Sequence, residues 1–152
     1  IDVGGLGGTS WVVVEQYIAE DVGDLTRERI GKTFQDWGIP TAISLVEVKQ
    51  STKLKVIASG GIRTGIDSAK ALALGAEVVG IAHPLLKAAV KGGETLLREL
   101  TTIITELKTA MFLVGAENVE KLRRVPVVIV GRTGEWLRVR GFNPESYARR
   151  TP

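Results

Sequence analysis

Ala58-Ser59-Gly60-Gly61-Ile62-Arg63-Thr64-Gly65 is the stretch that decides the fold of this chain. It joins an apolar run, Leu54 to Ala58, to a helical pattern from Asp67 to Leu74. Two glycines let the backbone come close to an anion, and the backbone N–H groups at the start of a helix attract one. The Arg63 guanidinium adds donors whose geometry suits phosphate oxygens. The stretch is therefore typical of a strand-to-helix turn that holds a phosphate.

Two further turns of this kind are expected on the same face of the fold. Val78 to Ala82 is a nearly uninterrupted apolar run, followed by His83 and by Pro84, which fits the first turn of a helix. A glycine-rich stretch, Gly4 to Ser10, follows the apparent strand end at Ile1 to Val3. Adjacent turns at the carboxyl ends of parallel strands are where (β/α)8 barrels bind the phosphate of a substrate or cofactor.

The pattern of the whole chain predicts an α/β fold. Apolar strands that alternate with helical patterns indicate a parallel sheet covered by helices on both faces. We predict that residues 1–115 are the C-terminal half of a (β/α)8 TIM barrel and that residues 116–152 form a C-terminal extension. The extension is expected to contain a short helix over 118–124, an extended apolar run over 125–130 and a helix over 133–140. We interpret it as packing on the barrel or on a neighbouring subunit.

Local sequence features place the helix boundaries. Ser10 predicts the start of a helix at Trp11, and Thr41 is a candidate N-cap for a second helix. The charged residues 20–32 suggest a surface excursion. Thr64 with Asp67 forms a T-x-x-D capping pair. The longest expected helix carries apolar residues at helical spacing from Leu96 to Met111.

Composition narrows the classes of function. The chain has 152 residues, no cysteine and a formal net charge of +3, so it offers no disulfide or thiolate site and no evidence for a nucleic-acid partner. Because no apolar run reaches the roughly 18 residues of a membrane span, we expect a cytoplasmic protein with no membrane partner. The chain begins at Ile1, inside an apparent strand, so we expect a longer protein whose N-terminal half completes the barrel.

Two motif-like stretches fail to match the patterns that they suggest. Gly31-Lys32-Thr33 resembles the end of a Walker A loop, but Thr26 stands where that pattern needs a glycine. Gly5-Leu6-Gly7 begins like a dinucleotide fingerprint, but Ser10 occupies the place of the third glycine. His83 is the only histidine, so neither a histidine metal site nor a Ser-His-Asp triad is indicated. The sequence leaves open whether His83 caps a helix or faces a ligand.

Three stretches resemble a known family, the flavin-dependent type 2 isopentenyl-diphosphate isomerases. They are Ile1–Trp11 (IDVGGLGGTSW), Asp36–Thr41 (DWGIPT) and Ala58–Gly65 (ASGGIRTG), and the tail from Val127 to Arg140 is similar in order and spacing. The third stretch is shared with many FMN barrels, including 2-hydroxy-acid oxidases and glutamate synthases. The first two stretches are more specific to the isomerase family and carry most of the resemblance.

The resemblance implies a cofactor, a reaction and a set of contacts. FMN is expected at the C-terminal ends of the strands, and reduced FMN is expected to isomerise isopentenyl diphosphate to dimethylallyl diphosphate in isoprenoid biosynthesis. NADPH would be the reductant and Mg²⁺ would bind the diphosphate. By position, the cofactor-binding residues would be Thr9, Gly60, Gly61, Ile62, Arg63, Ala82 and His83. The family's catalytic, substrate-binding and metal-binding residues lie before this segment, so none is assigned here, and a homo-oligomer is expected.

Two other functions stay open on the sequence alone. One is another FMN-dependent barrel oxidoreductase, of the 2-hydroxy-acid oxidase or glutamate synthase type. Such oxidases usually need a histidine near the flavin ring, and His83, beyond the last strand, is a poor candidate. The other is a non-catalytic half-barrel that binds a phosphate or assembles with a partner chain.

Overall fold

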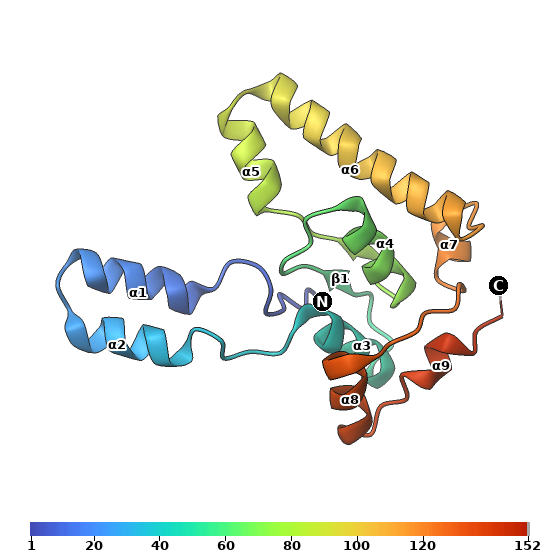
Figure 1. Cartoon of the computed structure of the whole chain (residues 1–152), viewed down its shortest axis with the longest axis horizontal. Coiled ribbons are helices and arrows are strands. Elements are labelled where there is room, and N and C mark those ends of the chain that lie inside the picture. The colour runs from blue at the N-terminus through green and yellow to red at the C-terminus, as the bar shows by residue number, and fades with distance from the viewer. Residues whose placement is uncertain (152) are drawn as a thin grey trace.

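Three short parallel strand segments lie at the centre of the computed structural model, which describes residues 1–151 (Figure 1). Strand β1 (Ile57–Ala58) pairs in parallel with β2 (Val78–Val79). On the other edge of β1, Asp2 forms a parallel bridge with Ile57, and the Val3 N–H donates to the Ile57 carbonyl at 3.1 Å. The predicted parallel arrangement is therefore confirmed for the first strand end, β1 and β2.

The strands are shorter than the apolar runs that predicted them. Leu54 is 56% exposed and lies before the ladder begins, so the predicted buried strand over 54–58 is wrong at its start. Val56 and Ala58 are buried, whereas Ile57 on the opposite face is exposed. Side chains alternate along a strand, so Val56 and Ala58 lie on one face of the sheet and Ile57 lies on the other. Within residues 1–151, helices cover only the face of Val56 and Ala58. The prediction of two covered faces therefore does not hold for this part of the barrel.

Helices α3 (Thr41–Ser51) and α4 (Gly65–Ala73) cover the buried face of the sheet. Thr64 and Asp67 form the predicted capping box, with the Asp67 N–H donating to Thr64 Oγ1 at 3.1 Å. The prediction that Thr41 caps α3 is wrong. Pro40 occupies the N-cap, and the Thr41 hydroxyl instead donates to the Gly60 carbonyl at 2.5 Å. The side chain thus ties α3 to the turn after β1.

The long helix predicted around Leu96 to Met111 is confirmed as α6 (Gly93–Leu113), which follows α5 (His83–Val90). Helix α6 packs on both α4 and α5, as Figure 1 shows. The α4–α6 crossing is close at Gly65, whose N–H donates to Glu106 Oε2 at 2.6 Å. A Cβ at Gly65 would lie 2.3 Å from the Ile103 carbonyl oxygen, so only glycine fits the observed packing.

The surface excursion predicted over residues 20–32 is part of a helical hairpin. Helix α1 (Trp11–Asp21) begins as predicted, with the Val13 N–H donating to Ser10 Oγ. The charged residues that follow form a second helix, α2 (Leu25–Phe34), which Asp24 caps. The hairpin projects away from the rest of the molecule (Figure 1). The polarity of these residues indicated a surface position but not a helix, because a two-helix hairpin on the surface needs few buried residues.

The C-terminal residues pack back onto the sheet and its helices. They form α7 (Val119–Leu122), α8 (Gly131–Val139) and α9 (Glu145–Ala148), joined by a run over 125–130 that is not a strand in the structure. Tyr147, buried in the main core, donates to the Leu74 carbonyl at 3.4 Å. The boundary at residue 115 stays a prediction. Among residues 1–151, no helix has the length and apolar character needed to cross a membrane.

Candidate functional site

A cavity of about 680 Å³ opens at the carboxyl ends of the three parallel strand segments. Its walls come from three turns: the glycine-rich turn after the first strand end, the turn after β1 and the turn after β2. The seven residues that the resemblance assigned to the cofactor all line it: Thr9, Gly60, Gly61, Ile62, Arg63, Ala82 and His83. The structure therefore brings the whole predicted set together, and their contact with FMN stays a prediction.

Backbone contact between the first two turns explains their glycines. Gly60 and Gly61 have positive φ angles of 100° and 88°, a region that side chains disfavour. A Cβ at Gly60 would lie 2.1 Å from the Gly5 carbonyl oxygen, and one at Gly61 would lie 2.3 Å from that of Gly7. The turns thus pack backbone against backbone, and this leaves the cavity wall free of bulky side chains.

Backbone N–H groups form the anion-binding part of the wall. Within residues 1–151, the N–H groups of Gly61, Ile62, Ala82 and His83 donate to no protein acceptor. Ala82 is the N-cap of α5 and makes no side-chain cap hydrogen bond. Free amides at a turn and at an uncapped helix start are groups that bind phosphate.

Helix α4 does not supply free N–H donors. This corrects the expectation that the start of the helix after Gly60 and Gly61 attracts the anion. The N–H groups of Arg63 and Thr64 both donate to Asp67 Oδ2, at 3.2 and 3.1 Å, and that of Gly65 donates to Glu106. Burial by itself would raise the pKa of Asp67, but the hydrogen bonds from the Thr64 side chain and from these two backbone groups together lower that pKa. A charged Asp67 therefore already occupies the start of α4.

Arg63 joins the first two turns through its guanidinium. Its Nη1 donates to the Gly61 carbonyl and its Nη2 to the Gly7 carbonyl, each at 2.8 Å. A guanidinium has five N–H donors, so other donors remain for an anion in the cavity. Arg63 is thus both a structural link and a source of positive charge at the site.

Asp2 and Ser59 form a polar pair that the sequence analysis missed. The Ser59 hydroxyl donates to Asp2 Oδ1 at 2.5 Å, and the same oxygen accepts from the Gly4 N–H at 3.1 Å. Both side chains line the cavity. The carboxylate gives the cavity a negative side opposite in charge to Arg63, which suits hydroxyl donors and disfavours a phosphate there. The position of Asp2 at the end of a strand was the available clue.

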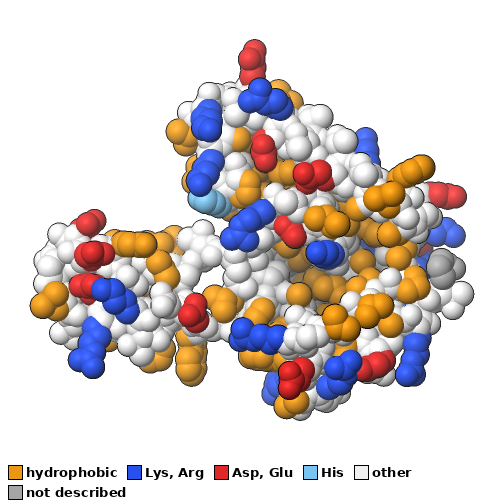
Figure 2. Space-filling model, viewed as in Figure 1, with side chains coloured by type: hydrophobic (Ala, Val, Ile, Leu, Met, Phe, Trp, Pro, Cys, Tyr) orange, Lys and Arg blue, Asp and Glu red, His pale blue; other side chains and the backbone are white. Residues whose placement is uncertain are grey.

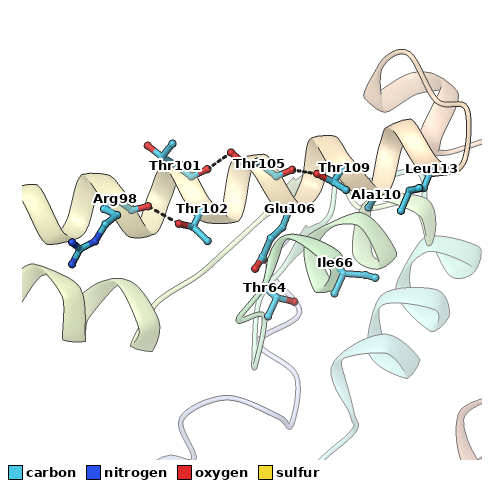
Figure 3. Close-up of a pocket in the computed structure, with 10 residues that line it drawn as sticks. All are labelled: Thr64, Ile66, Arg98, Thr101, Thr102, Thr105, Glu106, Thr109, Ala110 and Leu113. Carbon is cyan, nitrogen blue, oxygen red and sulfur yellow. Dashed lines mark hydrogen bonds between the residues drawn. The ribbon is translucent and has the colours of Figure 1, made fainter.

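A second hollow, of about 700 Å³, lies between α4 and α6 and lacks this chemistry (Figure 3). Threonines 102, 105 and 109 donate to the carbonyls of residues 98, 101 and 105, one turn earlier on α6. Their hydroxyl donors are therefore used within the helix, as the dashed lines in Figure 3 show. Over the described part of the chain, no cluster of three metal-ligating side chains occurs.

Comparison with known proteins identifies the family of the chain. The family model described as FMN-dependent dehydrogenase matches residues 34–128. A protein of Methanothermobacter thermautotrophicus named isopentenyl-diphosphate delta-isomerase is 53% identical over 99% of this chain and 42% of its own length. A protein of the same name from Thermococcus kodakarensis is 57% identical over 92% of this chain and 37% of its own length. The resemblance inferred from the sequence is confirmed, and the chain spans about two fifths of these curated relatives.

Solved structures support the fold. A crystal structure of mandelate oxidase with 3,3-difluoro-2-hydroxy-3-phenylpropionic acid aligns with a TM-score of 0.56 and 31% identity, over 74% of this chain and 36% of the oxidase chain. A mutant of mandelate oxidase with the monooxide FMN adduct aligns with the same TM-score of 0.56 and 31% identity, over 74% of this chain and 38% of its own. The predicted fold class, a C-terminal portion of a (β/α)8 barrel, is confirmed.

Proposed function

Because this chain belongs to the FMN-dependent dehydrogenase family, we propose that it forms the FMN-phosphate-binding part of an isopentenyl-diphosphate delta-isomerase. The proposed reaction converts isopentenyl diphosphate to dimethylallyl diphosphate. One observation carries the proposal. The stretch from Gly7 to Trp11 is specific to the isomerase family. Its residues Gly8, Thr9 and Trp11 line the same cavity as the Gly60-Gly61 turn.

The residues of the cavity fit an FMN molecule part by part. The free N–H groups of Gly61 and Ile62, with Arg63, suit a doubly charged phosphate. The Asp2–Ser59 pair suits the hydroxyls of a ribityl chain. Thr9, on the cavity wall, has a hydroxyl that can contact the polar edge of a flavin ring.

The chain's own role in catalysis would be to hold and orient FMN and to shield it from water. Reduced FMN, when bound, would supply the acid–base chemistry of the double-bond shift. Over residues 1–151, Asp2 is the only carboxylate on the cavity wall, and Ser59 and Gly4 already donate to it. Trp11 lies at the cavity and is 77% exposed, so it is placed to exclude water once the ligand is bound. NADPH as reductant, Mg²⁺ on the diphosphate and a cytoplasmic location belong to the same proposal.

The oxidase alternative has weaker support. Identity to mandelate oxidase is 31%, against 53% and 57% for the two isomerases described above. His83 lies on the cavity wall, but at the first residue of α5 rather than on a strand. The proposed completion of the barrel by further residues of a longer protein, and a homo-oligomeric assembly, stay predictions.

The test uses the intact gene product. We expect the purified protein to show flavin absorbance and, once reduced, to convert isopentenyl diphosphate. No oxidation of mandelate or lactate is expected. Turnover of a 2-hydroxy acid without isomerisation would favour the oxidase, and bound flavin without either turnover would favour the non-catalytic alternative. Either result would overturn the proposed reaction.

A further inference from the structure

Two side chains near the C-terminus of the chain complete the end of helix α4. Among residues 1–151, no backbone N–H donates to the carbonyls of Ala73 and Leu74, where the helix ends. Arg150 Nη1 donates to the Ala73 carbonyl at 2.6 Å, and the Tyr147 hydroxyl donates to the Leu74 carbonyl at 3.4 Å. A cation at this end of a helix also interacts favourably with the helix dipole. Arg150 and Tyr147 therefore hold the C-terminal end of α4.

Arg150 is itself held in place by its surroundings. Its Nη1 also donates to the Arg123 carbonyl at 2.9 Å, and its guanidinium carbon lies 4.1 Å from the centroid of the Tyr147 ring. A guanidinium over an aromatic face gains a cation–π interaction. Tyr147 is in turn buried in the main core. The core therefore fixes Tyr147, and Tyr147 helps to fix Arg150 against the end of α4.

The opposite end of α4 carries the arginine of the cavity. Arg63 directly precedes Thr64, the N-cap of α4, and its backbone N–H donates to Asp67 in the first turn at 3.2 Å. The helix has 9 residues, which span about 13 Å along its axis. A short hydrogen-bonded helix moves as a unit, so a shift of its C-terminal end also shifts the backbone of Arg63.

Hydrogen bonds at both ends set the direction of α4. Its side packs on α6 through small apolar residues such as Ala69, and apolar contact is non-directional. At the start of the helix, the Gly65 N–H donates to Glu106 Oε2 on α6. This bond fixes one point of α4, and a direction needs a second point. Arg150 and Tyr147 supply the second point.

Long-range attraction does not explain a role for Arg150 in anion binding. Attraction over a distance needs a surface of one sign of charge. Figure 2 shows acidic and basic side chains interspersed over the lobe that α8 and α9 form, on the face that it displays. The donors of Arg150 point to the carbonyls of Ala73 and Arg123. Any effect of Arg150 on a ligand in the cavity must therefore pass through α4.

We propose that Arg150 and Tyr147 are positioning residues for the cofactor: by holding the end of α4, they place Arg63 and its turn against the FMN phosphate. This role rests on the proposed function, since it takes FMN as the ligand of the cavity. Within residues 1–151, neither of the two side chains lines the cavity. Their removal should therefore weaken binding of the phosphate and leave contacts with the flavin ring unchanged.

The ratio of FMN affinity to riboflavin affinity, measured on the intact apoprotein, separates this role from a merely structural one. A variant that only destabilises the fold weakens both ligands by the same factor, so the ratio does not change. We expect Arg150→Ala to lower the ratio about fivefold, a part of the tenfold to hundredfold loss expected when the Arg63 guanidinium itself is removed. Arg150→Lys keeps the charge but not the two-donor fork, so it should restore part of the ratio.

A conservative variant and a matched control complete the test. Tyr147→Phe removes only a hydroxyl from a buried ring, so it should fold and lower the ratio about twofold. Arg149→Ala is the control, because Arg149 is exposed and its side chain makes no hydrogen bond among the described residues. Its ratio should equal that of the wild type. If Arg150→Ala does not fold, Tyr147→Phe decides in its place.

A double variant shows whether the effect passes through Arg63. In an Arg63→Ala background, Arg150→Ala should lower the ratio less than it does in the wild type, because the two residues act on the same contact. Equal losses in both backgrounds, or wild-type ratios in the single variants of a protein that prefers FMN, would overturn the positioning role and leave the proposed function standing. Equal affinity of the wild type for FMN and riboflavin would reject the phosphate site, and the positioning role with it.

Discussion

Gly60 decides whether the two glycine turns can meet. An alanine there combines a positive φ with a Cβ 2.1 Å from the Gly5 carbonyl oxygen. We expect Gly60→Ala to lower the free energy of unfolding by about 3 kcal/mol, from strain plus overpacking. Gly92→Ala is the matched control, since φ is +118° but nothing lies within 4 Å of its Cβ. Urea unfolding should give a loss of about 1 kcal/mol for the control, from backbone strain alone, and equal losses would contradict the packing argument.

Arg63 is expected to act on the ligand as well as on the turns. A hydrogen bond to a charged group contributes roughly 1.5–3 kcal/mol, so Arg63→Ala should weaken FMN binding about tenfold to a hundredfold. Thr9→Ala should weaken it less, by about 1 kcal/mol, because its hydrogen bond is neutral. Flavin fluorescence titration measures both. Wild-type affinity in both variants would place the cofactor elsewhere.

The seven residues that the resemblance assigned to the cofactor lie on one cavity wall, and the turn from Gly60 to Arg63 could also be identified from its local chemistry. A glycine pair after an apolar run, followed by an arginine, identifies its own turn. The Asp2–Ser59 pair could not be found this way, since its partners are 57 residues apart and meet only through strand pairing. The second role of Arg63 was likewise hidden, because its acceptor on Gly7 belongs to a different turn.

At the scale of the elements, the α4–α6 crossing depends on Gly65. Its Cβ position lies 2.3 Å from the Ile103 carbonyl oxygen and 2.4 Å from Glu106 Cβ. Gly65→Ala should therefore push the helices apart and cost about 2–3 kcal/mol of stability. Gly93→Ala is the control: it too is the first residue of a helix, yet nothing lies near its Cβ. Chemical denaturation that found no difference between them would contradict close packing at this crossing.

The stability of the start of α4 should depend on pH through the ionisation of Asp67. Its folded pKa lies below the ordinary 3.8, so the charged form adds stability above that pH, and this stability is lost as the pH falls through the lower folded value. We expect Asp67→Asn to be less stable than wild type by about 1 kcal/mol at neutral pH, because its carboxylate accepts hydrogen bonds from the Arg63 and Thr64 N–H groups. The difference should shrink at pH values below 3.8. A difference that stays constant with pH would show that the Asp67 charge does not matter.

Helices were easier to predict than strands for a physical reason. Periodic apolar residues and caps, as in α6 and at Thr64, act within one segment of the chain. Strand length depends on neighbours that the segment does not contain, and β1 and β2 each keep only two residues in the ladder. The α2 helix was missed because its charged residues also suit a loop.

The molecule as a whole places its ligand chemistry at one end of the sheet and a projecting hairpin beside it (Figure 1). Three turns from separate parts of the chain converge on one cavity of about 680 Å³. The cavity combines free amides and a guanidinium on one side with a carboxylate on the other. This distribution of charge predicts that a ligand's phosphate, more than its ring, determines affinity.

Comparing FMN with riboflavin tests that claim most directly. The two ligands differ only in the phosphate, so their affinity ratio for the intact apoprotein measures what the turns contribute. Since two or more charge-assisted hydrogen bonds contribute roughly 1.5–3 kcal/mol each, we predict that FMN binds at least about a hundredfold more tightly than riboflavin, and that Arg63→Ala reduces this ratio. Equal affinities for the two ligands would contradict a phosphate site at these turns.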